Sequence, residues 1–332
     1  MRGGSKSKTR PVNGPKGYIA FDLDLTLGCF QHTNPLAYFW GLETLSPAEE
    51  NRLSAALKNR LRAAQRRFAS QLLKSSDLLP LVLRKNIETL FGPIPFLKGE
   101  GRLGKVIIYS NSGVTSSLQL AADLIEQKFE SPGIFSLLAD VNHPIRKKFD
   151  YNPQNPGDPL KQFSTLQRLF KEAGASQPPQ PQQTLFVDDR NDHVLREEMR
   201  NGLTYIAPQP YITHPTQEQR ERLFYIGFDA LHSQGLLNNE EYLKSPLFKR
   251  NLHDGTHIET FMDLFLWIWK TMIERPESSG SSIWQDDTAA LQAHMERYLE
   301  KIQNPSAQKV YDGKKYSSPD AVGDGEAPVV VF

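Results

Sequence analysis

Three short apolar runs in the sequence each end in residues whose side chains carry oxygen atoms. These residues are Asp22 and Asp24 after the run 18–21, Ser110 and Asn111 after the run 105–109, and Asp188, Asp189 and Asp192 after the run 184–187. Carboxylates gathered in a partly dry crevice repel one another strongly unless a hard cation such as Mg²⁺ binds among them. If the three ends meet, the residues favour metal-assisted phosphate chemistry.

The elements that would bring these ends together are strands and helices in alternation. Short apolar runs bounded by turn signals are typical of buried parallel strands. The segments 118–129 and 161–173 carry apolar residues at helical spacing, so the order of elements fits βαβ units. The predicted fold class is therefore α/β, a Rossmann-like three-layer sandwich with a central parallel sheet. In open sheets of this kind, ligands bind beyond the carboxyl ends of the strands.

The composition of the chain sets limits on its class. It has 332 residues, of which 39% are hydrophobic and 23% charged, and its formal net charge of +1 indicates no class of partner. Cys29 is the only cysteine, which excludes an intramolecular disulfide framework and a thiolate zinc cluster. The N-terminal segment lacks the apolar core of a secretory signal. We therefore expect a cytoplasmic protein, with the nucleus as the alternative because this segment is basic.

The domain organisation can be predicted from changes in composition. Residues 1–16 are expected to be a disordered basic N-terminus, 17–210 a catalytic core, 211–303 a helical extension packing on that core, and 304–332 a disordered tail. The core contains a cap-like helical insert at about 30–95. Within it, Ser46 followed by Pro47 is a helix start signal, and leucines at helical spacing up to Leu72 predict one helix of roughly seven turns.

One stretch of the insert is strongly basic. Its single acid is Asp77, and its basic residues are Lys58, Arg60, Arg62, Arg66, Arg67, Lys74, Arg84 and Lys85. Such an excess of positive charge would attract an anionic substrate if the insert faces the site. The alternative is an ordinary solvated helix face.

The sequence Tyr-Ile-Ala-Phe-Asp-Leu-Asp-Leu-Thr-Leu around Asp22 resembles motif I of the haloacid dehalogenase (HAD)-like hydrolase superfamily. Ser110, followed by Asn111, is similar to motif II, and the acidic segment 188–192 is similar to motif IV. The resemblance covers Tyr18 to about Asp192, a little over half of the chain. Three clusters in the order of the family are a stronger signal than a lone Asp-x-Asp.

The family also places a lysine at or just before the helix that leads into the last motif strand. Lys161, in the sequence Asp-Pro-Leu-Lys-Gln-Phe, fits that place. Lys147 and Lys148 are the alternatives, because they too lie between the second and the last motif.

The resemblance implies a phosphomonoester hydrolase that works through an aspartyl-phosphate. Asp22 would be the nucleophile, and Asp24 would protonate the leaving oxygen and then deprotonate the attacking water. Family dehalogenases and transport ATPases lack an acid at the position of Asp24, which favours phosphatase activity here. Lys161 would neutralise Asp22 and the phosphoryl group.

The resemblance also implies the ligands of the metal and of the phosphoryl group. Ser110 and the Asn111 amide would donate hydrogen bonds to phosphoryl oxygens. Thr26 is counted with these phosphate-binding residues and would help to hold the motif I turn. The expected cofactor is Mg²⁺, bound by Asp22, the backbone carbonyl of Asp24, Asp188, Asp189 and Asp192, the last two directly or through water.

The substrate class follows from the insert. Family members with a mobile cap usually act on small phosphorylated molecules, so a small molecule is expected more than a phosphoprotein or a nucleic-acid end. The alternative function is a catalytically weak HAD-fold phosphate-binding or scaffold protein that docks a protein or nucleic-acid partner. The amphipathic helix predicted at 257–273 could serve this role through its aromatic residues, which otherwise complete the core. Because this helix is short and interrupted by charges, no membrane span is expected.

Two further residues have open interpretations. Arg146 lies on a predicted loop, where it could contact an anionic substrate or be a surface arginine. Cys29 closely follows the motif I strand, but no histidine partner is identifiable in the sequence, so a buried structural thiol is expected.

Overall fold

The centre of the molecule is a parallel β-sheet. The computed structural model describes residues 16–42, 45, 47–152, 159–190, 195–251, 255–274 and 287–303. The sheet order is β3-β2-β1-β4-β5, and all four strand pairs are parallel. Its strands are β1 Gly17–Phe21, β2 Leu103–Tyr109, β3 Leu137–Ala139, β4 Thr184–Val187 and β5 Thr204–Ile206. The predicted fold class, an α/β protein with a central parallel sheet, is confirmed.

Strand β1 is the middle strand and is buried along its whole length. Tyr18 and Ala20 pack into the hydrophobic cluster on one face of the sheet, while Ile19 and Phe21 pack into the cluster on the other. This is why the run is apolar at every position rather than alternating. The last residue, Phe21, is in register with Ile108 of β2 and Val187 of β4. Segments that follow these three strands therefore start at the same edge of the sheet.

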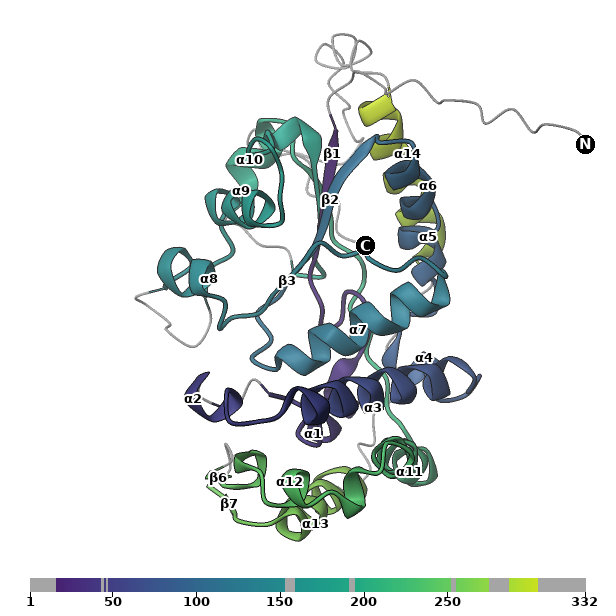
Figure 1. Ribbon diagram of the computed structural model, residues 1–332. Coiled ribbons are helices and arrows are strands. Elements are labelled where there is room, and N and C mark those ends of the chain that lie inside the picture. The colour runs from purple at the N-terminus through teal and green to yellow at the C-terminus, as the bar shows by residue number, and fades with distance from the viewer. Residues whose placement is uncertain are drawn as a thin grey trace, which may run out of the picture.

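Helices cover both faces of the sheet and complete three layers (Figure 1). On one face lie α9 (Phe163–Glu172) and α10 (Arg196–Arg200), with α8 (Pro144–Phe149) beside α9. The helices on the other face are α5 (Ile87–Phe91), α6 (Ile94–Gly99), α7 (Thr115–Lys128) and α14 (Thr288–Gln303).

The remaining helices form a second group, which lies at the bottom of Figure 1, beyond α7. From the insert come α1 (Asn34–Ala37), α2 (Pro47–Glu50), α3 (Ala55–Leu73) and α4 (Leu79–Val82). From the C-terminal part come α11 (Gln217–Ser233), α12 (Glu240–Leu243), α13 (Phe261–Ile273) and the hairpin of β6 (Arg250–Asn251) and β7 (His257–Ile258). Helix α11 packs against α3 and α13. The C-terminal helices are thus divided: α11 and α13 contact the insert helices, whereas α14 contacts α5 and β5.

The long helix expected after Ser46 is interrupted, so the prediction of seven continuous turns was wrong. A helix does begin at Pro47, but it ends at Glu50, and Ser46 lies outside the described residues. Helix α3 starts anew, because the hydroxyl of Ser54 accepts a hydrogen bond from the backbone N–H of Leu57. The N–H and hydroxyl of Ser54 both donate to the carboxylate of Glu241, which fixes this break.

Polar contacts tie the insert to the core through α3 and α7. The Nε2 of Gln65 donates to the backbone oxygen of Ser116 at 2.7 Å, and the guanidinium of Arg62 pairs with the buried carboxylate of Asp123. Buried polar groups of this kind are costly to separate, since each would lose its partner. The insert is therefore packed against the core along α3.

The basic stretch of the insert does not form one free positive surface. Lys58 pairs with Glu50 at 3.3 Å, Arg67 pairs with Asp229 of α11 at 3.3 Å, and Arg62 pairs with Asp123 of α7. Arg84 is only 1% exposed. Acids distant in sequence thus offset much of the charge, a point that the local count of residues could not reveal.

The aromatic side chains of α13 lie against the core. Phe261, Phe265, Trp267 and Trp269 are partly buried and contact the hydrophobic cluster that includes Phe224. The exposed apolar residues of this helix are instead Met262 and Leu266.

Among the described helices, none has the length and apolar character needed to cross a bilayer. The predictions of disorder concern residues 1–16 and 304–332, and of these only Lys16 is within the described part of the chain.

Candidate active site

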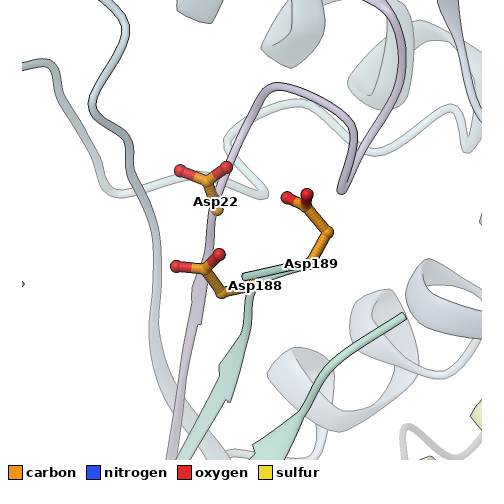
Figure 2. A group of neighbouring side chains, drawn as sticks. All are labelled: Asp22, Asp188 and Asp189. Carbon is orange, nitrogen blue, oxygen red and sulfur yellow. The ribbon is translucent and has the colours of Figure 1, made fainter. Parts of the chain in front are cut away.

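Three aspartates meet at the carboxyl edge of the sheet. Asp22 directly follows β1, and Asp188 and Asp189 follow β4, the neighbouring strand (Figure 2). One carboxylate oxygen from each residue lies within 4.8 Å of the others. The backbone N–H of Asp22 donates to the carbonyl of Val187 at 2.8 Å, so the parallel ladder itself sets the spacing of these carboxylates.

Lys161 joins two of these carboxylates. Its Nζ donates to Oδ1 of Asp22 at 2.6 Å and to Oδ2 of Asp188 at 2.7 Å, and the lysine is only 2% exposed. It lies two residues before the start of α9. The alternatives, Lys147 and Lys148, belong to α8 and are exposed. Among the three lysines, the structure therefore brings Lys161 to the aspartates.

The turn after β1 is strained and closely held. Leu25 has a φ of 63°, a left-handed conformation that costs free energy for a residue with a side chain. Its carbonyl accepts hydrogen bonds from Nη2 of Arg84 at 2.9 Å and from the backbone N–H of Tyr211 at 2.8 Å. At Gly28, where the turn ends, a Cβ would lie 1.9 Å from the carbonyl oxygen of Val82, so only glycine fits.

Thr26 connects this turn to the acidic pair after β4. Its hydroxyl donates to Oδ1 of Asp189 at 2.8 Å and accepts from the backbone N–H of Asp189 at 2.8 Å. Its carbonyl accepts from Nε of Arg84 at 2.6 Å. In this arrangement Thr26 holds the turn and orients Asp189.

The electrostatics of the site reflect an excess of buried acids. Burial, together with the charges of Asp22 and Asp189, raises the pKa of Asp24 to about 7. Burial and the charges of Asp22 and Asp188 likewise raise the pKa of Asp189 to about 7. Burial lowers the pKa of Lys161, but Asp188 and Asp22 outweigh that effect and bring it above its ordinary value, so the lysine stays charged.

The donor set of this cluster fits a hard divalent cation. It consists of carboxylate oxygens, and the ammonium of Lys161 pairs with two of the three carboxylates, those of Asp22 and Asp188. Oxygen donors with excess negative charge are what Mg²⁺ prefers. Asp192, predicted as a further ligand, lies outside the described residues.

Ser110 and Asn111 follow β2, which lies on the opposite side of β1 from β4. Ser110 is 1% exposed, and its hydroxyl accepts from the backbone N–H of Ser112 at 3.2 Å. The side chain of Asn111 donates from Nδ2 to the carbonyl of Pro159 at 3.2 Å and accepts at Oδ1 from Arg146 at 2.6 Å. The side-chain amide of Asn111 is thus bonded within the protein.

Arg146 lies neither on a loop nor at the surface, so these two expectations were wrong, while its contact with an anionic substrate stays a prediction. It belongs to α8, is 1% exposed, and pairs through Nε with the buried carboxylate of Asp150 at 2.8 Å. Its guanidinium also donates to the carbonyl of Ser110. A surface position was expected because arginine is seldom buried unless it is paired, and the pairing residue could not be identified from sequence.

Cys29 is buried, as predicted. The expectation that it has no histidine partner was wrong, because Nε2 of His32 lies 3.3 Å from its Sγ. The same Nε2 is 2.9 Å from the carbonyl oxygen of Thr213, which can only accept a hydrogen bond. The proton on Nε2 is thus donated to that carbonyl, so His32 does not act as a base toward the thiol.

Sequence reasoning missed several residues that shape the site. Arg84 was counted only as one charge of a basic stretch, and Tyr109 and Asp150 were not considered. One signal was present: Arg84 directly follows the apolar run Leu81–Leu83, which suggests burial. Nothing in the local sequence around Asp150 indicates its role.

The fold and site together define an α/β protein with a lysine-bridged acidic cluster at the carboxyl ends of parallel strands. No protein-family model and no curated protein matches the chain. A solved structure that it does match is a HAD-superfamily hydrolase, subfamily IA, variant 1, from Geobacter sulfurreducens PCA, with 16% sequence identity. The match covers 59% of this chain and 88% of the other, with a TM-score of 0.28.

Proposed function

We propose that the protein is a Mg²⁺-dependent phosphomonoester hydrolase that works through an aspartyl-phosphate on Asp22. The observation that carries this proposal is the buried contact of Lys161 with both Asp22 and Asp188, beside Asp189. A charged lysine between the ends of two strands leaves carboxylate oxygens for a cation and places a positive charge beside the nucleophile.

In the first half of the reaction, a carboxylate oxygen of Asp22 attacks phosphorus. The new O–P bond forms as the bond from phosphorus to the leaving oxygen breaks. Asp24 gives its proton to that oxygen, so the product leaves as a neutral alcohol. A pKa of about 7 suits this role, because a substantial fraction of Asp24 is protonated near neutral pH.

In the second half, Asp24 is ionised and takes a proton from water. The water oxygen attacks phosphorus, the O–P bond to Asp22 breaks, and inorganic phosphate leaves. Asp22 is thereby restored as a carboxylate and Asp24 as an acid. Throughout, the ammonium of Lys161 offsets negative charge at Asp22.

The residues that would hold the metal are Asp22, Asp188 and Asp189, with Asp192 and the backbone carbonyl of Asp24 as further proposed ligands. A bound Mg²⁺ supplies positive charge that offsets the charge of the transferring phosphoryl group. The hydroxyl of Ser110 and the backbone N–H of Asn111 are proposed as donors to the phosphoryl oxygens, because they follow β2 beside β1.

We also propose that the substrate is a small phosphate ester. The nucleophile Asp22 is 6% exposed, and Asp188 and Lys161 are buried. A phosphoryl group at the end of a small molecule can enter such a site more easily than one attached to a folded protein or a duplex end.

The proposal is tested by measuring phosphate release from an aryl phosphate in Mg²⁺ and in EDTA. Wild type is compared with Asp22→Asn and Asp24→Asn, and with Asp229→Asn as a control that changes an acid at the surface. We expect Mg²⁺-dependent turnover in wild type and control, and loss of turnover in both site variants.

Two results would overturn the proposal. One is undiminished turnover by folded Asp22→Asn, which would remove the nucleophile from the mechanism. The other is the absence of turnover by folded wild type with Mg²⁺ on aryl phosphate, sugar phosphates and nucleotides.

A further inference from the structure

A buried polar network connects the two segments that would bind the phosphoryl group, residues 110–111 after β2 and residues 160–162 just before α9. Its members are Tyr109 at the end of β2, Arg146 on α8 and Asp150 just after α8, which are 0%, 1% and 0% exposed. The carboxylate Oδ2 of Asp150 accepts from the hydroxyl of Tyr109 and from Nε of Arg146, each at 2.8 Å.

One end of this network holds the motif II segment. The guanidinium of Arg146 donates to the carbonyl of Ser110 and, at 2.6 Å, to Oδ1 of Asn111. Its planar fork thus serves three acceptors at once, and its carbon Cζ lies 4.5 Å from the ring centroid of Tyr109. A lysine has no such fork and cannot reproduce these contacts.

The other end holds the segment that carries Lys161. The backbone N–H of Gln162 donates to the hydroxyl of Tyr109 at 3.0 Å, and the N–H of Leu160 donates to the backbone carbonyl of Asp150 at 3.0 Å. Both neighbours of the lysine are therefore fixed. Lys161 itself precedes α9, so no helical hydrogen bonds of its own fix its place.

We propose that the pair Arg146 and Asp150, with Tyr109, is a positioning unit that sets Lys161 and the Ser110–Asn111 segment in one common arrangement. This inference rests on the proposed function, in which both segments contact the phosphoryl group. In the described part of the chain, none of the three residues forms a hydrogen bond to the carboxylates of the acidic cluster. They act through the residues they hold.

The chemistry of the network suits this role. Burial, followed by the charge of Asp150, raises the pKa of Tyr109 well above its usual value, so the hydroxyl remains a donor to Asp150 while it accepts from Gln162. Removing the hydroxyl of Tyr109 alone would take away the acceptor of the Gln162 backbone N–H. It would also remove one of the donors to the carboxylate of Asp150. Because small displacements of groups that bind the reacting phosphoryl group slow the chemical step strongly, the effect should appear in kcat.

The test is Tyr109→Phe, compared with Tyr242→Phe as a matched control. Tyr242 is also fully buried and donates its hydroxyl to a backbone carbonyl, that of Phe39 at 2.8 Å, within the helical group rather than at the site. For Tyr109→Phe we expect kcat on an aryl phosphate to fall roughly 10- to 100-fold, while the control keeps wild-type kcat. Both should lose a similar amount of thermal stability.

Amide hydrogen exchange gives a readout that does not need turnover. In Tyr109→Phe, amide exchange should accelerate in two separate segments, 110–112 and 160–162. In Tyr242→Phe, exchange in these two segments should stay as in wild type. If wild type has no phosphatase activity, the proposed function fails, and faster exchange in both segments would still support the common arrangement. Acceleration at Gln162 alone, or a kcat loss no greater than that of the control, would overturn the inference.

A second variant, Arg146→Lys, keeps the positive charge beside Asp150 but removes the fork. If it folds, we expect a loss of kcat of the same kind together with faster exchange at 110–112. Wild-type kcat in folded Arg146→Lys would contradict the positioning role of the guanidinium.

Discussion

The Nζ of Lys161 lies 2.6 Å from Oδ1 of Asp22, although 139 positions separate the two residues in the chain. The same nitrogen lies 2.7 Å from Oδ2 of Asp188. A buried ammonium shared by two carboxylates is favourable only while both partners stay in place, since each charge would otherwise be desolvated without compensation. The contact therefore links the stability of the site to its proposed chemistry.

Replacing this ammonium should affect both properties. In Lys161→Met, Asp22 and Asp188 face each other without a counter-charge, so we expect a loss of about 3–5 kcal/mol in the free energy of unfolding. We also expect kcat to fall roughly 100-fold or more, because a charge beside the phosphoryl group is lost. Urea denaturation and phosphate release would measure the two effects.

The control is Lys147→Met, which removes an exposed lysine of the competing pair. A surface substitution should change the free energy of unfolding by no more than about 0.5 kcal/mol. If this control lost activity while Lys161→Met kept it, the assignment of the catalytic lysine would be wrong.

The metal-free protein should lose stability as the pH rises from about 4 to about 7. The pKa values of Asp24 and Asp189 are raised to about 7 in the folded state. The unfolded chain releases these protons first, so in that window the folded state binds more protons and its free energy of unfolding falls with increasing pH. Above about pH 7, the contribution of Asp24 and Asp189 to the free energy of unfolding is lost.

Urea denaturation in EDTA at several pH values would measure this slope. Saturating Mg²⁺ should counteract it, because the cation binds the ionised carboxylates. Asp24→Asn removes one titrating group and should give a shallower slope. A slope unchanged in that variant would show that Asp24 does not titrate as described.

Asp287, just before α14, should stabilise the turn after β1 through its ion pair with Arg84. Its carboxylate lies 3.3 Å from Nη1 of Arg84, whose other nitrogens hold the carbonyls of Leu25 and Thr26. In Asp287→Ala the guanidinium stays buried without its carboxylate, so we expect a cost of about 3–5 kcal/mol in the free energy of unfolding. Turnover should also decline, because the turn next to Asp24 is loosened.

The comparison is Asp229→Ala, which breaks the exposed pair with Arg67. Exposed pairs contribute about 1 kcal/mol or less, since water and salt screen them. If urea denaturation showed equal losses in the free energy of unfolding for the two variants, the buried pair of Arg84 and Asp287 would stabilise the protein no more than the exposed pair does.

Gly28→Ala should distort the same turn by steric overlap. The added Cβ would lie 1.9 Å from the carbonyl oxygen of Val82, which is backbone and cannot rotate away. Overpacking of this kind costs about 1–3 kcal/mol or more in the free energy of unfolding. Thermal denaturation compared with Gly99→Ala, whose Cβ would meet nothing within 4 Å, provides the check. A Tm equal to that of the Gly99 variant would contradict the close approach.

Much of the fold could be predicted because its signals are local. The apolar runs that became β1, β2 and β4 are buried on both faces, and burial on both faces leaves a continuous apolar run in the sequence. The same reasoning placed Asp22 and Asp188 at strand ends. It failed for the insert, where α2 ends at Glu50 and a new helix begins after Ser54, whose N–H and hydroxyl bind Glu241, far away in the chain.

The sequence by itself determined the strand ends and the residue types that meet there, since hydrophobic periodicity and oxygen-bearing side chains are properties of short segments. Only the tertiary structure decided which lysine reaches Asp22, that Arg146 is buried against Asp150, and that Arg84 holds the carbonyl of Leu25. Each of these contacts joins segments through space. Their free energy depends on burial and on the distance between partners, and neither quantity is defined until the chain has folded.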